Sequence, residues 1–284
     1  MIAHKVFSSG SKLAIRHSFD LAVFEAIYPF NALTGRALYK VRDQKTHLFY
    51  ALKIFSLDLN DRREIEREIL SMNKADLGNI VPKCRALSVE GNEARLLMDW
   101  VEGKTFAQEY ALPLKDYYDL RNRVTMLQEL CFAVDKIHAH QIFHRDLKPE
   151  NIILSSDSGP GTKVRLIDFG LSNVKRQNSE GSACRAPEQD GRRDFNLRAQ
   201  VDVFALGKIG WWLITGNLPQ LYENEDTCGD WDNLEGLDLN NECPLAAKSL
   251  GDVLKTALAY SPEKRYRHAR HMAMALKNAK LKEG

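Results

Sequence analysis

The chain has 284 residues, of which 44% are hydrophobic and 27% are charged, with a net charge of +2. This composition is that of an ordinary globular protein and excludes a largely disordered chain, and the length suffices for one large domain or for two lobes that each bury a core. The basic residues do not gather into one long run, so nothing indicates nucleic-acid binding.

The five cysteines are widely spread and odd in number, without a CxxC pair or a Cys/His spacing typical of zinc. This pattern favours neither a disulfide framework nor a zinc site and fits a reducing compartment. The N-terminus has no basic-then-apolar signal pattern, and no apolar run reaches the roughly 20 residues that a membrane helix needs. We expect a soluble, cytoplasmic protein without a membrane span, acting in its own cell or delivered into another.

The first hundred residues predict mostly short strands, at 37–41, 48–55, 86–89 and 94–100. One helix is predicted among them, over 58–75, because apolar residues recur there at helical spacing (Ile65, Ile69 and Met72). Polar side chains at the start of this segment are available to cap the helix (Ser56, Asp58 and Asn60).

After Gly103 the pattern changes to long amphipathic helices, predicted at 117–139, 200–215 and 246–260. Strands first and helices afterwards predict an α+β protein with two lobes. We place an N-terminal extension at 1–21, a small β-rich lobe with one helix at 22–98, a hinge at 99–103 and a larger, mostly helical lobe at 104–284.

Residues 144–151 read HRDLKPEN and crowd a histidine, two cations and two acids between apolar segments. Charges among buried elements are costly unless they are paired, bind metal or do chemistry. A second acidic signal follows in VRLIDFG, residues 164–170, where a predicted buried strand delivers Asp168 to a turn ending in Gly170. Ala186-Pro187-Glu188 comes next along the chain.

HRDLKPEN, then DFG, then APE resemble the motifs of the eukaryotic-type serine/threonine protein kinases, in the family's order and over Tyr28 to Arg270. The resemblance implies the bilobal protein-kinase fold. It also implies an enzyme that uses ATP and Mg²⁺ to transfer the γ-phosphoryl group to serine or threonine hydroxyls of protein substrates.

Within this resemblance, each task of phosphoryl transfer has a candidate residue. Asp146 would accept or orient the proton of the substrate hydroxyl, and Lys148 would neutralise charge on the transferred phosphoryl group. Asn151 and Asp168 would hold Mg²⁺. Lys148, two residues after Asp146, resembles serine/threonine kinases rather than tyrosine kinases. The alternative interpretation is a set of structural ion pairs in a loop.

Upstream, Lys53 in Ala51-Leu52-Lys53 resembles the strand lysine that contacts the α and β phosphates and pairs with a helix glutamate. Two glutamates are candidates. Glu66 precedes Ile69 and Leu70, which would place it on an inward face of the helix. Glu68 better matches the usual distance from Lys53 and is slightly favoured.

Met98-Asp99-Trp100-Val101 resembles the hinge strand of the family. Met98 would occupy the gatekeeper place, and backbone groups of Asp99 and Val101 would hydrogen-bond adenine. Three further apolar residues match those that sandwich the adenine ring, and together they would form a flat apolar slot: Leu38, Ala51 and Ile153.

The phosphate loop departs from the family's G-x-G-x-x-G, because residues 31–38 hold one glycine, Gly35. We place the phosphate contact at Gly35. Backbone amides could still meet phosphate, and Asn31 tolerates a left-handed conformation. The departure predicts a looser or differently shaped lid and puts ATP affinity in question.

The activation segment, residues 168–188, is short, and the family's threonine and tyrosine before APE are replaced. Arg145 would, in the family, meet a phosphate on this segment, for which there are three local candidates: Ser172, Ser179 and Ser182. A short segment can also be ordered without phosphate.

Two structural anchors match the family as well. Asp202 would tie down the catalytic loop, and Arg265 would pair with Glu188.

Residues 223–242 hold eight acids and no Lys or Arg. They are a solvated loop or, alternatively, a docking patch for a basic protein partner.

Three functions stay open. The first is a serine/threonine protein kinase. The second is a weakly active or inactive kinase-fold scaffold, suggested by the altered phosphate loop and the acidic segment. The third is a kinase-fold transferase acting on a small molecule, against which Lys148, Asp202 and the APE motif argue.

Overall fold

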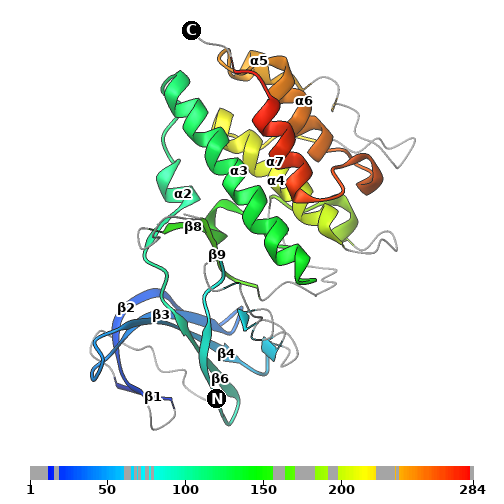
Figure 1. The fold of residues 1–284 in the computed structure, drawn as a ribbon. Helices are drawn as coiled ribbons and strands as arrows, with labels where there is room; N and C mark the ends of the chain where they lie inside the picture. The colour runs from blue at the N-terminus through cyan, green and yellow to red at the C-terminus, as the bar shows by residue number, and fades with distance from the viewer. Residues whose placement is uncertain are drawn as a thin grey trace. The chain divides into compact units, whose positions relative to one another are not determined.

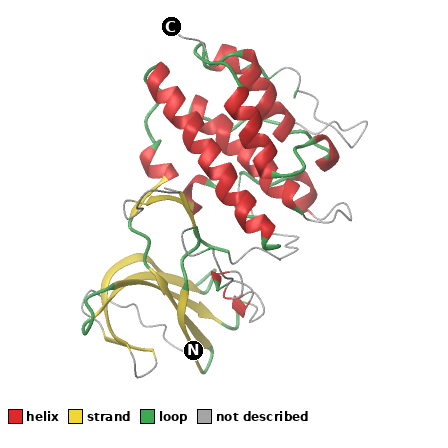
Figure 2. Ribbon diagram, in the orientation of Figure 1, coloured by secondary structure: helices red, strands yellow, loops and turns green. Residues whose placement is uncertain are grey.

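The computed structural model describes residues 12–15, 19–60, 65, 66, 69, 72, 73, 77, 80–155, 164–169, 183–190, 198–221, 234 and 237–281. The chain forms two compact units, Met1–Glu102 and Gly103–Gly284. Strands dominate the first unit and helices the second (Figure 2). The α+β class and the two lobes are therefore confirmed, and the boundary between the units falls inside the segment predicted as a hinge.

The first unit is built on one antiparallel sheet with strand order β1-β2-β3-β4-β6-β5 (Figure 1). Its strands are β1 Lys12–Ile15, β2 Phe19–Asn31, β3 Arg36–Asp43, β4 Phe49–Ser56, β5 Cys84–Glu90 and β6 Glu93–Asp99. Buried and partly buried residues alternate along β3, as expected of a strand with one face on a core. That face packs the core of the unit, which includes Leu21, Tyr39, Leu52 and Leu97.

All four predicted strands are confirmed, with ends that differ by two residues or fewer. The longest strand, β2, was not predicted, and β1 lies in the segment taken as an extension. Irregularities in the pairing of β2 with β3 explain the omission, because register shifts near Glu25, Tyr28 and Asn31 break the two-residue alternation on which strand prediction depends.

The predicted helix at 58–75 is only partly right. Ile65, Glu66, Ile69 and Met72 are helical, but residues 58–60 form a turn and a bend. The reason is the side chain of Asn60, which donates hydrogen bonds to backbone carbonyls of earlier residues. It holds this segment in the turn that follows β4.

The second unit combines a small sheet with a group of helices. The sheet has the order β7-β8-β9, with β7 Gly103–Thr105, β8 Ile152–Ser155 and β9 Val164–Leu166. The α-helices are α2 Phe106–Glu109, α3 Tyr117–Ala139, α4 Ala199–Thr215, α5 Leu239–Glu242, α6 Lys248–Ala257 and α7 Ala269–Asn278. Short 3₁₀ turns are η1 Pro149–Asn151, η2 Pro187–Asp190 and η3 Pro262–Lys264. Helix α3 lies alongside α4 and α7 (Figure 1).

The long helix α3 has the predicted bounds. Asp116 caps its start, where Oδ1 accepts from the backbone N–H of Asp119 at 2.9 Å. Helix α4 begins one residue before the prediction, and α6 is shorter than predicted at both ends. No helix in the described part of the chain is long and apolar enough to cross a membrane.

Candidate active site

A buried aspartate at the start of α4 holds the loop that carries Asp146. Asp202 has no exposed surface. Its carboxylate accepts from the backbone N–H groups of His144 at 2.8 Å and Arg145 at 2.7 Å. His138 Nε2 lies 2.8 Å from the same carboxylate. Burial tends to raise the pKa of Asp202, but the His138 hydrogen bond and the neighbouring donors outweigh it and lower the pKa. The predicted anchor is therefore present as an ionised, fully bonded group.

Two non-glycine residues of this region have left-handed backbone conformations. Arg145 has φ 62° and Asp168 has φ 63°. Such conformations cost energy in residues with a Cβ and persist where the surroundings impose them. At Arg145 both ends are bonded, because its N–H donates to Asp202 and its carbonyl accepts from Gln189 Nε2 at 2.8 Å.

Two of the predicted site residues, Lys148 and Asn151, contact Asp146. Lys148 Nζ lies 3.3 Å from Asp146 Oδ2. Asn151 Nδ2 donates to the Asp146 carbonyl at 2.9 Å and lies 3.3 Å from its Oδ2. Burial raises the pKa of the Asp146 carboxyl above its ordinary value, against the opposing effect of the Lys148 ammonium. The arrangement presents a desolvated carboxylate beside one cation.

Asp168 is delivered by a strand end that the catalytic loop holds from both sides. The Ile167 N–H donates to the Asn151 carbonyl at 3.0 Å, and His144 Nε2 lies 3.0 Å from the Ile167 carbonyl. On the other side of Asp168, the ring of Phe169 contacts that of His144 in a tilted arrangement, with centroids 4.6 Å apart. The same short loop thus positions the backbone on both sides of Asp168.

The side chains of Asn151 and Asp168 offer oxygen atoms, which are suitable ligands for Mg²⁺. The Asn151 amide nitrogen is used by Asp146, so its oxygen is the atom that this side chain can offer a cation. Mg²⁺ takes one or two protein oxygens and completes its shell with phosphates and water. Among the described residues there is no cluster of three or more His, Cys, Asp or Glu able to hold a metal.

In the first unit, strand register places the predicted nucleotide residues on one face of the sheet. Leu38 on β3 pairs with Lys53 on β4, and Ala51 on β4 pairs with Met98 on β6. Directly paired side chains share a face. These four residues therefore lie opposite the core face, on the side where the resemblance puts adenine and phosphate. Ile153, the remaining apolar residue, lies on β8 of the second unit.

The hinge segment is held by a lysine that the sequence analysis missed. Lys40 Nζ lies 4.5 Å from the Trp100 ring centroid, 4.7 Å from that of Phe49 and 3.2 Å from Glu102 Oε2. Trp100 Nε1 donates to the same Glu102 oxygen at 2.6 Å. A cation among aromatic faces and a carboxylate is a stabilising arrangement. Two features of the sequence could have indicated this contact. They are Lys40, two residues after Leu38 on the same strand, and the W-x-E spacing of Trp100 and Glu102.

Asp99, predicted to meet adenine through its backbone, is itself well anchored. Its N–H donates to the Lys83 carbonyl at 3.0 Å. Its carboxylate forms a two-pronged pair with Arg85, with distances of 2.5 and 2.9 Å. Val101, the other predicted hinge contact, is 8% exposed. The adenine contacts of both residues stay predictions.

The segment predicted as the phosphate loop is a compact turn. Asn31 Oδ1 accepts from Leu33 N–H at 2.8 Å and Thr34 N–H at 3.3 Å, and Gly35 N–H donates to the Asn31 carbonyl at 2.7 Å. Gly35 has φ +62°, and a Cβ there would lie 3.0 Å from Leu59. The left-handed residue is thus Gly35 and not Asn31.

Asn60 fastens this turn to the end of β4. Its Nδ2 lies 3.1 Å from the Thr34 carbonyl, 3.3 Å from that of Gly35 and 2.9 Å from that of Ser56. Arg36 Nε donates to its Oδ1 at 2.6 Å. Three of the turn's amides are used internally, which differs from the expectation that its backbone amides meet phosphate. The role of Gly35 as a phosphate contact stays a prediction.

Several predicted residues lie outside the described part of the chain: Glu68, Gly170, Ser172, Ser179 and Ser182. Glu66 is described, and its side chain is exposed rather than inward-facing. The choice of Glu68 as the partner of Lys53 stays a prediction.

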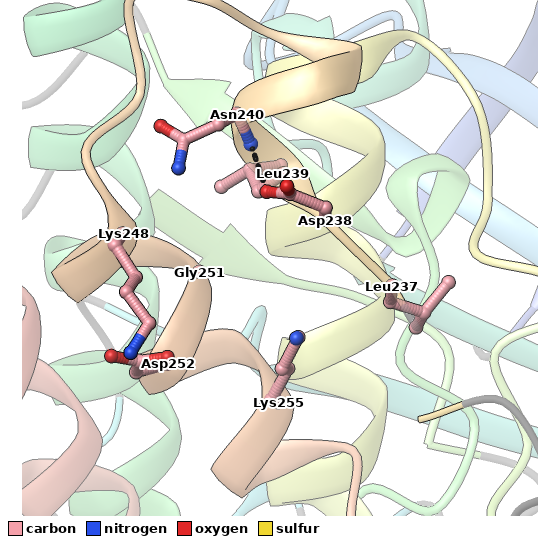
Figure 3. A pocket seen from close by; sticks show the side chains of 8 residues that line it. All are labelled: Leu237, Asp238, Leu239, Asn240, Lys248, Gly251, Asp252 and Lys255. Atoms are coloured by element: carbon pink, nitrogen blue, oxygen red, sulfur yellow. Dashed lines mark hydrogen bonds between the residues drawn. The ribbon is translucent and has the colours of Figure 1, made fainter. Parts of the chain in front are cut away.

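A separate polar pocket lies beside α5 and α6. It has a volume of about 250 Å³ and is lined by Leu237, Asp238, Leu239, Asn240, Lys248, Gly251, Asp252 and Lys255 (Figure 3). It contains none of the predicted site residues. Two acids of the predicted acidic segment have structural contacts, because Asp238 caps α5 and Glu242 accepts from Trp211 Nε1 at 3.0 Å.

Comparison with known proteins agrees with this geometry. The protein kinase domain family matches residues 34–277, so the chain belongs to the protein kinase family. The kinase domain of PknI from Mycobacterium tuberculosis has a similar fold, with a TM-score of 0.69 and 21% identity over 95% of this chain and 98% of that one.

Relatives occur in several organisms. A probable myosin light chain kinase of Dictyostelium discoideum is 27% identical over 206 residues, 69% of this chain and 52% of that protein. Serine/threonine-protein kinase C of Synechocystis sp. is 28% identical over 210 residues, 69% of this chain and 36% of that protein. Serine/threonine-protein kinase Pkn1 of Myxococcus xanthus is 30% identical over 60% of this chain and 25% of that protein. The chain thus spans about half the length of these relatives or less.

Proposed function

We propose that this chain is an ATP- and Mg²⁺-dependent serine/threonine protein kinase. The observation that carries the proposal is the set of bonds that brings Lys148 and Asn151 onto Asp146 and ties the strand end before Asp168 to the same loop. The names of the relatives support serine and threonine as acceptors, and Lys148 supports the same class by its place two residues after Asp146.

In the proposed reaction, Asp146 accepts the proton of the substrate hydroxyl and orients that oxygen. The oxygen forms a bond to the γ-phosphorus while the bond from that phosphorus to the bridging oxygen of ADP breaks. Lys148 neutralises charge on the transferred group, and Lys53 holds the α and β phosphates. Asn151 and Asp168 would hold Mg²⁺, which would supply charge neutralisation on the phosphate oxygens.

The apolar side chains of the nucleotide face supply the flat surface that an adenine ring requires. Leu38, Ala51 and Met98 share that face with Lys53 through the register of β3, β4 and β6. Ile153 of the second unit completes the proposed set, and the backbone groups of Asp99 and Val101 supply the polar contacts.

The proposed partners are proteins with a serine or threonine acceptor, with basic residues where they meet the acidic segment 223–242. The proposed compartment is the cytoplasm. Free thiols at Cys131 and Cys243 support a reducing environment.

A weakly active scaffold is the second candidate, and one observation favours it. The amides of Leu33, Thr34 and Gly35 donate within their own turn, whereas the family's loop offers its amides to phosphate. A kinase with this turn would depend more on Lys53 and on Mg²⁺ to hold the phosphates.

The destination of labelled phosphate tests the proposal. The purified protein, Mg²⁺ and γ-labelled ATP are incubated with generic protein substrates, and phosphoserine and phosphothreonine are measured after hydrolysis. The proposal predicts label on both residues. Label only on small molecules would support a small-molecule transferase. No transfer, with thermal stabilisation by nucleotide, would support the scaffold.

A further inference from the structure

The residue after the APE motif reaches back to the catalytic loop. Gln189 Nε2 donates to the backbone carbonyl of Arg145 at 2.8 Å, across 44 residues of sequence. Its Oε1 accepts from the Ala186 N–H at 2.9 Å. The two contacts require different ends of the amide, one a donor and one an acceptor, so they fix its orientation.

The carbonyl that Gln189 binds belongs to the peptide bond between Arg145 and Asp146. The other side of Arg145 is bonded as well, because its N–H donates to Asp202 Oδ1 at 2.7 Å. Between these two bonds Arg145 has φ 62°, a conformation that its surroundings must impose. Rotation of the 145–146 peptide would move the Asp146 side chain, so a bond to this carbonyl limits where the carboxylate can point.

Gln189 can act in this way because its own backbone is rigidly held. The preceding residue, Glu188, is 5% exposed and forms a two-pronged ion pair with Arg265 at 2.7 and 2.9 Å. The Gln189 N–H donates to the Ala186 carbonyl at 3.0 Å, which closes the turn η2. The side chain therefore projects from a fixed point toward the catalytic loop.

We propose that Gln189 is a positioning residue for phosphoryl transfer: its amide holds the Arg145 carbonyl and so sets the direction of Asp146. The inference rests on the proposed function and deepens it, because it links the APE segment to the catalytic aspartate. The inference assigns different roles to two neighbouring residues. Glu188 holds the segment in the fold, and Gln189 transmits its position to the reacting group.

Two substitutions separate positioning from simple turn stability. Gln189→Glu keeps the oxygen that accepts from Ala186 but replaces the donor to Arg145 with a second acceptor. Gln189→Ala removes both contacts. Gln128→Glu is the matched control, because it makes the same chemical change on a partly buried face of α3, outside the active-site residues.

The measurements are kcat, the KM for ATP and the thermal midpoint of each variant. We expect kcat to fall roughly tenfold in both Gln189 variants, since one well-placed hydrogen bond has about that effect. The KM for ATP should be unchanged, because Gln189 contacts no predicted nucleotide residue. Gln128→Glu should match the wild type in both constants.

Three results would overturn the inference while the wild type is active. The first is a wild-type kcat in Gln189→Glu, with kcat lowered only in Gln189→Ala. The second is a fall in kcat that parallels a fall in the thermal midpoint. The third is an equal fall in kcat in Gln128→Glu. A wild type that transfers no phosphate would instead refute the proposed function, and the inference would fall with it.

Discussion

Arg265 and Glu188, 77 residues apart in the sequence, form a buried ion pair in which Nη1 lies 2.7 Å from Oε1 and Nη2 lies 2.9 Å from Oε2. Their side chains are 0% and 2% exposed. Arg265 also donates to three backbone carbonyls, those of Ala259, Tyr260 and Gln200. One guanidinium therefore joins the APE segment, the start of α4 and the turn before η3.

Arg265→Ala should lower the free energy of unfolding by about 3–5 kcal/mol, because it leaves a buried carboxylate and several carbonyls without their donor. Urea unfolding of both proteins measures the difference. Glu188→Gln should cost less, since it keeps the shape and one acceptor. A loss in Arg265→Ala under about 1 kcal/mol, the size typical of an exposed pair, would contradict this account of the contact.

Asp202→Asn should destabilise the protein at neutral pH by about 1–3 kcal/mol, because the buried donors that share this carboxylate keep only one of its two acceptor oxygens. The pKa of Asp202 is lowered in the folded state from its ordinary 3.8. The contribution of its charge is therefore complete above that value and is lost as the pH falls through the lower, folded pKa.

The matching measurement is denaturant unfolding of the wild type and Asp202→Asn over a pH series. The difference between them should be constant from about pH 7 to pH 5 and shrink only below the unfolded pKa. Asp252→Asn, on the exposed side of α6, serves as the control and should change little. A difference that widens in acid would mean that the carboxylate is not held as described.

Asn60→Ala should loosen the turn at 31–35 and lower the free energy of unfolding by about 1–3 kcal/mol, because the buried amide bonds to three carbonyls. Asn60→Asp should be similarly damaging, since it keeps the acceptor for Arg36 but loses the donors. Asn122→Ala, exposed on α3, is the control. Stability equal to the wild type in Asn60→Asp would show that the donors matter little.

Lys40→Ala should cost about 1–2 kcal/mol of stability through the lost contacts with Trp100, Phe49 and Glu102. It should also raise the KM for ATP, because Trp100 and Glu102 belong to the predicted hinge. Lys40→Arg should retain most of both properties, since a guanidinium also stacks on aromatic faces. Lys83→Ala is an exposed control in the same unit. A KM for ATP that is unchanged in Lys40→Ala would separate this lysine from nucleotide binding.

The sequence predicted elements whose signal is local and regular. The apolar stripe of α3 and the alternation of β3 gave correct positions, and the contiguous HRDLKPEN run placed Asp146, Lys148 and Asn151 together. Bulged β2 has no such period and was missed. Contacts between residues far apart in the sequence could not be predicted, because the fold and not the neighbouring residues determines which partner a residue meets.

Asn60 and Gln189 show this limit most clearly. Asn60 looked like a helix cap because it precedes a helical pattern, yet apart from Ser56 its partners lie 24 to 26 residues earlier, on the phosphate turn and at the start of β3. Gln189 follows a recognised motif, but its partner is a backbone carbonyl, which carries no side-chain identity that a sequence could reveal. Motifs predicted which residues would react, whereas the contacts of Asn60 and Gln189 became visible only in the folded structure.

The rate of phosphate transfer by Asp146→Asn, measured beside the wild type with γ-labelled ATP and a protein substrate, tests the central claim most directly. We predict a fall of about 10²–10⁴-fold in kcat, the usual contribution of a positioned base. The thermal midpoint should not fall, because burial raises the pKa of Asp146 and its charge is unfavourable in the folded state. Equal rates for the two proteins would contradict the claim that Asp146 is the residue on which transfer depends.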